Sequence, residues 1–298
     1  MILRCLVAAF FMVAFGRATA EDITLTGASA FSAMQKMTCG TLDEGVARYG
    51  VFEGRTYSRV PGEKDRHLFD VLGINVRHCK VLEDENKGRG FRSVGREIMV
   101  YMDPESGEII DSWTNPWTGD EISVVHVAND PVNMRAPRYE FDDDGNSSLE
   151  MSLRHYGGVV ANSREVPLFY KNPLGGDYQA YVGGTYHAME IFNSFYDSER
   201  LLDNETASVG QSHLGWTRVA KWLPWLEMGD HAGIMVFNAS GFSTFDKDRV
   251  PQRLVEILNE RYPTYWTPPP LDDARPNETS WTVFKKYIDA RDEVSDGD

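Results

Sequence analysis

Beyond its first twenty residues, the chain lacks any apolar run of the roughly 20 residues that a helix needs to cross a bilayer. It has only three cysteines, which excludes the dense disulfide framework of small secreted domains. Basic residues are also scarce: 30 Lys and Arg stand against 45 Asp and Glu, a formal net charge of −15. Such an acidic chain repels phosphate backbones and anionic lipid heads, so neither nucleic acid nor a membrane surface is expected as a partner.

Sequence motifs of the well-known chemistries are absent too. There is no Gly-x-Ser-x-Gly elbow, His-Glu-x-x-His pair, Cys-x-x-Cys pair or phosphate-binding loop. Gly88-Arg89-Gly90 begins like a dinucleotide-binding fingerprint, but Ser93 occupies the place of the third glycine and a strand is expected to follow. These patterns predict no metal site and leave any cofactor unknown.

The N-terminus has the three parts of a secretory signal. Arg4 precedes an apolar run from Cys5 to Phe15, and Ala18-Thr19-Ala20 supplies a small-residue cleavage site. The alternative, a membrane anchor, would need a run about twice as long. We therefore expect residues 1–20 to be removed and residues 21–298 to act in the periplasm or outside the cell.

Two cysteines, Cys39 and Cys79, remain after this cleavage. In an oxidising compartment they could form one disulfide, which would close a loop of about 40 residues and stabilise the fold by about 3 to 4 kcal/mol. Two buried free thiols are the alternative. The sequence leaves both open.

Short runs rich in β-branched and aromatic residues, separated by turn residues, fill the middle of the chain. Turns at Asp103–Gly107 and Asn115–Asp120 place Pro and Gly where tight reversals need them. Consecutive hairpins of this kind predict an antiparallel meander. The expected strands are Leu68–Val81, Gly90–Met102, Glu108–Thr114, Glu121–Val127, 149–156, 165–171, 178–196 and Ile234–Phe237.

Helices are expected on either side of the strand region. Residues 28–38 carry apolar side chains at helical spacing, Pro251 suits the first turn of a helix that ends before Pro263, and a last helix contains Val283–Ile288. Gly183-Gly184 would bend the strand at 178–196. We predict one mainly β (α+β) domain, a curled or barrel-like antiparallel sheet with a few flanking helices.

Two histidine segments carry the candidate catalytic residues. His126 and Asp130 share one side of a strand while the strand lasts, and a histidine beside a carboxylate can act as a general base. Asn129 would point the other way, and a plain turn at Asn129-Asp130-Pro131 is the alternative. His187 and Glu190 would face one side only on a helix, so the expected strand sends one inward and one outward.

Arginine and aromatic side chains are the candidate ligand-binding groups. Arg92 and Arg96 share one side of an expected strand and would hold an acidic group if that side faced the interior. Trp216 and Trp222, with Tyr186 and Asn129, could line a pocket for an organic molecule. Surface charge and ordinary core packing are the alternatives.

Three segments of the chain resemble one known family. They are residues 91–132, which contain VGREIMVYMDPESGEIIDSWTNPWTGDEISVVHVANDPV, then KWLPWLEMGDHAG at 221–233 and PNETSWTVFK at 276–285. They are similar to the family filed as domain of unknown function 1838, over about residues 34–287. The resemblance implies a single full-length domain and an exported bacterial, or fungal, protein with ties to secondary metabolism, but it assigns no reaction.

Three functions are compatible with these features. The first is an exported enzyme that acts on a small organic substrate by acid–base chemistry, with His126, Asp130, His187 and Glu190 as acting groups. The second is a non-catalytic carrier for an apolar or aromatic acidic ligand, anchored by Arg92 and Arg96. The third is an envelope interaction protein whose interior is only packed core.

Overall fold

The structure is a computed structural model that describes residues 20–134, 136–147, 149–170 and 186–295. Most of the expected signal peptide lies outside these ranges, as does the expected glycine bend at Gly183-Gly184. The first described strand begins at Ala20.

Eleven strands form one antiparallel sheet, in the order β1-β9-β10-β11-β12-β13-β2-β3-β4-β7, with β8 also paired to β4. The two ends of the path, β1 and β7, do not pair, so the described strands form an open sheet and not a closed barrel. The strands are β1 (Ala20–Thr26), β2 (Arg48–Arg59), β3 (Arg66–Asp84), β4 (Gly88–Met102), β7 (Val127–Asn129), β8 (Arg138–Tyr139), β9 (Glu150–Tyr156), β10 (Val159–Tyr170), β11 (Tyr186–Asp197), β12 (Ser212–Ala220) and β13 (Ile234–Thr244).

The predicted antiparallel fold with flanking helices is confirmed. The meander is interrupted, however, because β5 (Ser112–Thr114) and β6 (Glu121–Ser123) form a separate two-stranded sheet before β7 returns to β4. The sequence reading also missed β1, β2 and β12. Strand β2 pairs with β13, which begins 175 residues after β2 ends (Arg59 to Ile234). A local sequence pattern cannot predict a pairing partner that far away.

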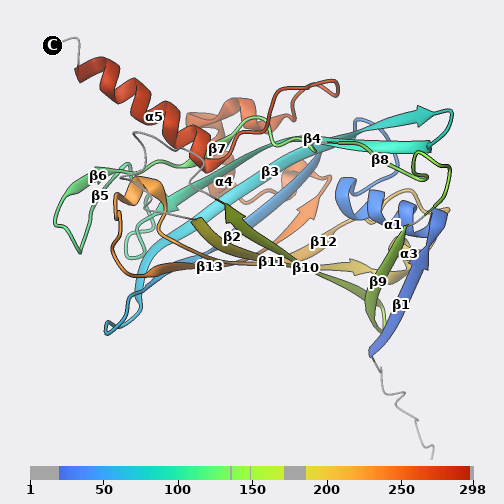
Figure 1. The fold of residues 1–298 in the computed structure, drawn as a ribbon, viewed down its shortest axis with the longest axis horizontal. Helices are drawn as coiled ribbons and strands as arrows, with labels where there is room; N and C mark the ends of the chain where they lie inside the picture. The colour runs from blue at the N-terminus through green and yellow to red at the C-terminus, as the bar shows by residue number, and fades with distance from the viewer. Residues whose placement is uncertain (1–19, 135, 148, 171–185, 296–298) are drawn as a thin grey trace, which may run out of the picture.

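The helices lie at the ends of the sheet and on one of its faces (Figure 1). Helix α1 (Gly27–Cys39) and α3 (Ser198–Leu202) lie at the end near β1 and β9, and α5 (Ser280–Ser295) lies at the opposite end. Helix α4 (Gln252–Arg261) and the 3-10 turn η4 (Pro263–Trp266) pack against alternate residues of β2, β3 and β4. The short helices η2 (Pro224–Leu226) and η3 (Lys247–Arg249) complete the set.

Strand alternation gives the sheet two distinct faces. The outer face carries Val51, Ile74 and Ile98, which form one core cluster with α4 and η4. The opposite, inner face carries Phe69, Tyr101 and Phe237, which form a second cluster with η2 and α5. Successive strand residues point to opposite faces, so the strand register assigns every other position to one face or the other.

The two remaining cysteines form a disulfide. Cys39 at the end of α1 is bonded to Cys79 on β3, with 5.7 Å between their Cα atoms. Both residues are buried against Phe31 and Phe91. Of the two possibilities left open by the sequence, the structure has the bonded pair, which ties α1 to the sheet.

Candidate functional site

Arg92 and Arg96 lie on the outer face, beneath the C-terminal connector. The guanidinium of Arg96 donates to the carbonyl oxygens of Thr264 and Thr267 at 2.7 and 3.0 Å, and that of Arg92 donates to Leu271 at 3.2 Å. The two arginines do share one side of β4, as expected. Their partners are main-chain groups of residues 264–271, so in the described structure they hold this connector to the sheet.

Asp130 pairs with arginines and not with His126. Its carboxylate lies 3.0 Å from Arg96 Nε and 2.8 Å from Arg275 Nη2. It follows the last residue of β7, Asn129, so the strand on which His126 and Asp130 were to share a side contains neither of them. The predicted His126–Asp130 pair is therefore not assembled as a unit.

His126 is buried at the edge of β4. Its Nδ1 accepts a hydrogen bond from the backbone N–H of Tyr101 at 3.1 Å. Its Nε2 lies 3.6 Å from the carboxylate of Asp111, beyond hydrogen-bond distance. Burial, with the nearby charge of Arg261, lowers the pKa of His126 to about 4. A neutral imidazole in this position serves as the hydrogen-bond acceptor for the Tyr101 N–H on β4.

His187 and Glu190 lie on opposite faces of β11, as strand alternation requires. His187 is exposed on the outer face. Glu190 is on the inner face, where its carboxylate accepts a hydrogen bond from Arg218 Nη1 at 3.0 Å. The histidine of this segment and its glutamate therefore do not act on one site.

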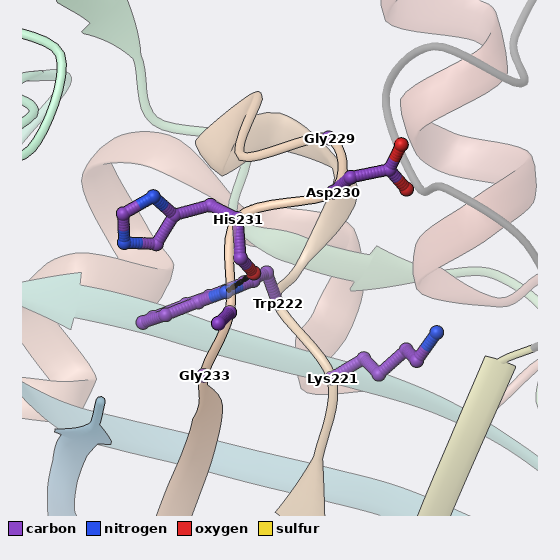
Figure 2. Close-up of a pocket in the computed structure, with 7 residues that line it drawn as sticks. Lys221, Trp222, Gly229, Asp230, His231 and Gly233 are labelled. Atoms are coloured by element: carbon purple, nitrogen blue, oxygen red, sulfur yellow. Dashed lines mark hydrogen bonds between the residues drawn. The ribbon is translucent and has the colours of Figure 1, made fainter. Parts of the chain in front are cut away.

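Trp222 lies beside a small surface pocket of about 220 Å³, whose lining residues are Lys221, Trp222 and the 229–233 loop. Its indole Nε1 donates to the carbonyl oxygen of His231 at 2.9 Å. Figure 2 shows the ring of His231 on one side of this loop and the side chains of Lys221 and Asp230 directed to the other. The charged groups do not converge, which leaves the pocket without an assembled polar site.

A first polar group on the inner face centres on Arg218 of β12. Its guanidinium donates to the Glu190 carboxylate at 3.0 Å and to the Tyr186 hydroxyl at 2.8 Å. The side chains of Arg218 and Glu190 are 17% and 18% exposed, so water reaches the pair from the interior side. Burial lowers the pKa of Arg218, but Tyr186 and Glu190 outweigh burial and the net shift is upward. The guanidinium is therefore a permanent cation.

A second polar group lies on β3 and β4. Asn75 donates to the carboxylate of Glu97 at 3.2 Å and accepts from Arg77 Nε at 2.7 Å. Burial raises the pKa of Glu97, against the opposing effects of Asn75 and Arg77. Glu97 and Arg77 nevertheless keep part of their surface accessible. A side chain that faces the interior and still touches solvent indicates that the interior beside it is not filled solidly.

The two polar groups face each other across the inner face. In a flat sheet, the four strand steps from β12 to β4 would separate them by about 19 Å. Yet Glu190 and Arg218 both shift the pKa of Glu97, and Arg218 also acts on Tyr101 of β4. Helix α1 contacts β9 as well as β3 and β4. With 13 residues it is about 20 Å long, whereas the seven strand steps from β9 to β4 would cover about 34 Å in a flat sheet. The sheet must therefore curl, with its inner face concave.

Several buried polar atoms on this face have no hydrogen-bond partner among the described residues. They are Trp216 Nε1, Arg218 Nε, Thr56 Oγ1 and Asn129 Oδ1. Strand register places all four on the inner face. Trp216 and Arg218 are two residues apart on β12 and point to the same side as Phe192 and Glu190. Thr56 lies across from Phe237, and Asn129 lies across from Glu97. Buried polar atoms are normally paired. The inner face thus carries polar groups that the described residues leave unsatisfied.

Four residues that the sequence indicated as candidates lie on this face: Asn129, Tyr186, Glu190 and Trp216. Glu97, Arg218 and Arg77, which complete the site, were not identified from the sequence. Glu97 lies on the side of β4 opposite Arg92 and Arg96, as strand alternation requires. Arg218 could be found only from the β11–β12 register, and β12 was not recognised as a strand.

Among the described residues, no group of three or more His, Cys, Asp or Glu side chains is arranged to hold a metal ion. None of the helices within the described ranges is both long and apolar enough to span a bilayer. The polar chemistry of the inner face thus comes from arginine, glutamate, tyrosine, asparagine and tryptophan side chains.

The family comparison agrees with the resemblance seen in the sequence. No curated protein matches the chain. The family model described as protein of unknown function (DUF1838) matches residues 47–288. This match extends from the start of β2 into α5 and includes Arg77, Glu97, Glu190 and Arg218. The chain belongs to the DUF1838 family.

Proposed function

We propose that the inner face of the sheet binds a small organic molecule. The observation that carries this proposal is that two polar groups, Arg218–Glu190–Tyr186 and Asn75–Arg77–Glu97, face each other across a concave surface and remain partly accessible. Ligand sites in proteins are concave surfaces with aromatic walls and a few directed polar groups. The inner face has all three features.

Aromatic side chains supply the apolar part of the site. Trp216 lies across from Phe192 on the neighbouring strand, and its ring meets that of Phe52 edge-on, with 6.0 Å between the centroids. The indole N–H of Trp216 has no partner among the described residues. A ring with one free donor can bind both the apolar body and an oxygen atom of a ligand.

Fragment binding tests this proposal. The probes are phenol, indole, benzamide, benzoate and benzylamine. Their binding is detected by ligand-observed NMR and by an increase in the melting temperature of the protein. Trp216→Phe keeps the aromatic ring and removes the donor, and should weaken bound fragments that carry an oxygen by about two- to tenfold. Thr217→Val, on the outer face of the same strand, is the matched control and should change nothing. Absence of binding by every fragment, or equal effects of the two variants, would refute the site.

Acid–base chemistry by Glu97 is the second candidate function. The supporting observation is the partly accessible carboxyl of Glu97, whose pKa burial raises and which Asn75 holds in place. A raised pKa makes a carboxylate a stronger general base than an ordinary glutamate. The test is exchange of the α-hydrogens of phenylacetone with D₂O. Glu97→Gln should abolish any acceleration by the protein while fragment binding persists, whereas a pure carrier shows no acceleration at all.

We also propose that the protein is exported. The Cys39–Cys79 disulfide supports this, because disulfides persist mainly in oxidising compartments. Cell fractionation and N-terminal sequencing of the purified protein test it. We expect a mature N-terminus at Glu21, and a chain that keeps Met1 and stays in the reducing cytoplasm would contradict export.

A further inference from the structure

Two arginines lie directly opposite each other on the inner face, near α1. Arg48 of β2 and Arg77 of β3 are partners in the antiparallel register. Cross-strand partners have their Cβ atoms about 5 Å apart, and like charges in such pairs destabilise the sheet. Arg48 is only 4% exposed, so solvent screens this repulsion poorly.

Neither arginine forms an ion pair with a carboxylate of the described residues. Arg48 donates to Ser212 Oγ at 2.6 Å and to the carbonyl oxygen of Met37 at 3.5 Å, and its buried Nε has no partner there. Arg77 donates through Nε to Asn75, and its interaction with Glu97 is electrostatic, at a distance beyond that of an ion pair. Buried guanidinium groups normally have an anionic partner.

Two more side chains join this pair from the far side of the curl. The guanidinium of Arg164 on β10 lies 5.4 Å from the centre of the Phe192 ring, and its charge acts on Arg77. Tyr196 on β11 packs in one cluster with Ala33 of α1, and the Cys39–Cys79 disulfide fixes the end of α1 two residues from Arg77, on the same side of β3. The hydroxyl of Tyr196 also shifts the pKa of both Arg48 and Arg77. Three guanidinium groups and a phenol from four strands therefore gather at one end of the inner face.

The charges of the inner face do not balance. Arg218 is neutralised by Glu190, and Glu97 acts electrostatically on Arg77 without forming an ion pair with it. Among the described residues, the inner face thus carries four arginines, Arg48, Arg77, Arg164 and Arg218, together with two glutamates, Glu97 and Glu190, in a chain whose net charge is −15. A carboxylate of a ligand would supply the missing negative charge, because two guanidinium groups can each donate to its oxygens.

We propose that the ligand of the inner face is a small aromatic carboxylic acid, with its carboxylate at Arg77, Arg164 and Tyr196 and its ring against Phe52, Phe192 and Trp216. The inference rests on the proposed function and names the class of ligand. Continuity between the two parts of the site supports it: Arg164 stacks on Phe192, and Phe192 lies across from Trp216. The acid-binding end and the aromatic wall are therefore adjacent.

Matched acids and amides test the inference on the full-length mature protein. The probes are phenylacetate and benzoate, each compared by calorimetry with its amide, which has the same shape and no charge. The acids should bind at least about tenfold more tightly than the amides. Arg164→Met and Arg77→Met should each remove most of this preference and change amide affinity by less than about threefold.

Arg154→Met is the control. Arg154 is an exposed arginine on β9 that pairs with Asp22, so its substitution removes one positive charge away from the proposed site. It should leave the preference for acids unchanged. If acids and amides bind equally, the inference is wrong while the binding site stands. If neither kind binds, the proposed function fails with it. If all three arginine variants lose the preference alike, the effect is one of net charge and the inference is also wrong.

Discussion

Glu97 on β4 and Arg218 on β12 interact electrostatically across the inner face, although strands β13, β2 and β3 lie between their strands. The sheet curls to bring them together, since helix α1 contacts β9 near one end of the strand order and β3 and β4 near the other. It follows that the polar groups of two distant hairpins meet in one concavity, which neither hairpin would form alone. The site is thus a property of the whole sheet, and changes in curvature should affect ligand binding as much as changes in the polar residues.

His126 should make stability fall as the pH drops. Its folded pKa of about 4 lies below the ordinary value of 6.5, because burial and the nearby charge of Arg261 disfavour the protonated ring. The unfolded chain therefore takes up this proton first, and stability present above about pH 6.5 is lost progressively down to about pH 4. Between about pH 7 and pH 5 the loss should be about 2 kcal/mol.

The measurement for His126 is urea unfolding across this pH range. In His126→Asn, whose amide oxygen can still accept from Tyr101, the dependence on pH should be shallower by about 2 kcal/mol. Parallel curves for the two proteins would show that His126 titrates normally in the folded state.

Reduction of the Cys39–Cys79 disulfide should destabilise the protein by about 3 to 4 kcal/mol, since it opens a loop of 40 residues in the unfolded chain. Unfolding in guanidinium chloride with and without a reductant measures this loss. The Cys39→Ala, Cys79→Ala double variant is the control, because reductant should leave its midpoint unchanged. A parent protein that is insensitive to reductant under conditions that cleave the bond would contradict the expectation.

Arg96→Met should loosen the C-terminal connector more than Arg92→Met. Arg96 holds two carbonyl oxygens and the Asp130 carboxylate, whereas Arg92 holds one carbonyl oxygen. We expect losses of about 2 to 3 and about 1 kcal/mol in the free energy of unfolding. Amide hydrogen exchange of residues 263–271 should rise more in Arg96→Met. Equal exchange in both variants, or weaker aromatic-acid binding without faster exchange, would instead support a ligand-binding role for these arginines.

Much of the fold was predictable from local patterns. Hairpin β3–β4, helix α4 after Pro251 and the alternation on β11 follow from strand patterning, turn residues and a proline at a helix start. Strand β12 was hidden because Gly215 and the tryptophans around Pro224 obscure its alternation. The pairing of β13 with β2 could not be predicted, because it depends on tertiary packing between segments far apart in sequence.

The site was harder to predict than the fold. The side of a strand on which a residue lies is local information, and it correctly placed Glu190 on the side opposite His187. Which side is the interior depends on where α4 and the connector pack, and they cover Arg92 and Arg96. Arg92 and Arg96 therefore lie on the outer face, whereas the inner-face arginines that form no ion pair among the described residues come from β2, β3 and β10.

Gly73→Ala should disturb the curl of the sheet. A Cβ at Gly73 would lie 2.7 Å from the carbonyl oxygen of Ile98 and run into the ring of Phe52. Overpacking of this kind costs about 1 to 3 kcal/mol. Gly158→Ala is the matched control, because a Cβ there meets no heavy atom within 4 Å and the stability should change by less than about 0.5 kcal/mol.

Thermal and urea unfolding measure the effect of Gly73→Ala, and a second substitution identifies its cause. Phe52→Leu in the Gly73→Ala background makes room for the added methyl group and should recover part of the lost stability, although Phe52→Leu alone destabilises the parent. Additive losses in the double variant would show that the Phe52 ring is not what confines this position. The close approach of the Ile98 carbonyl oxygen to Gly73 would then account for the loss of stability.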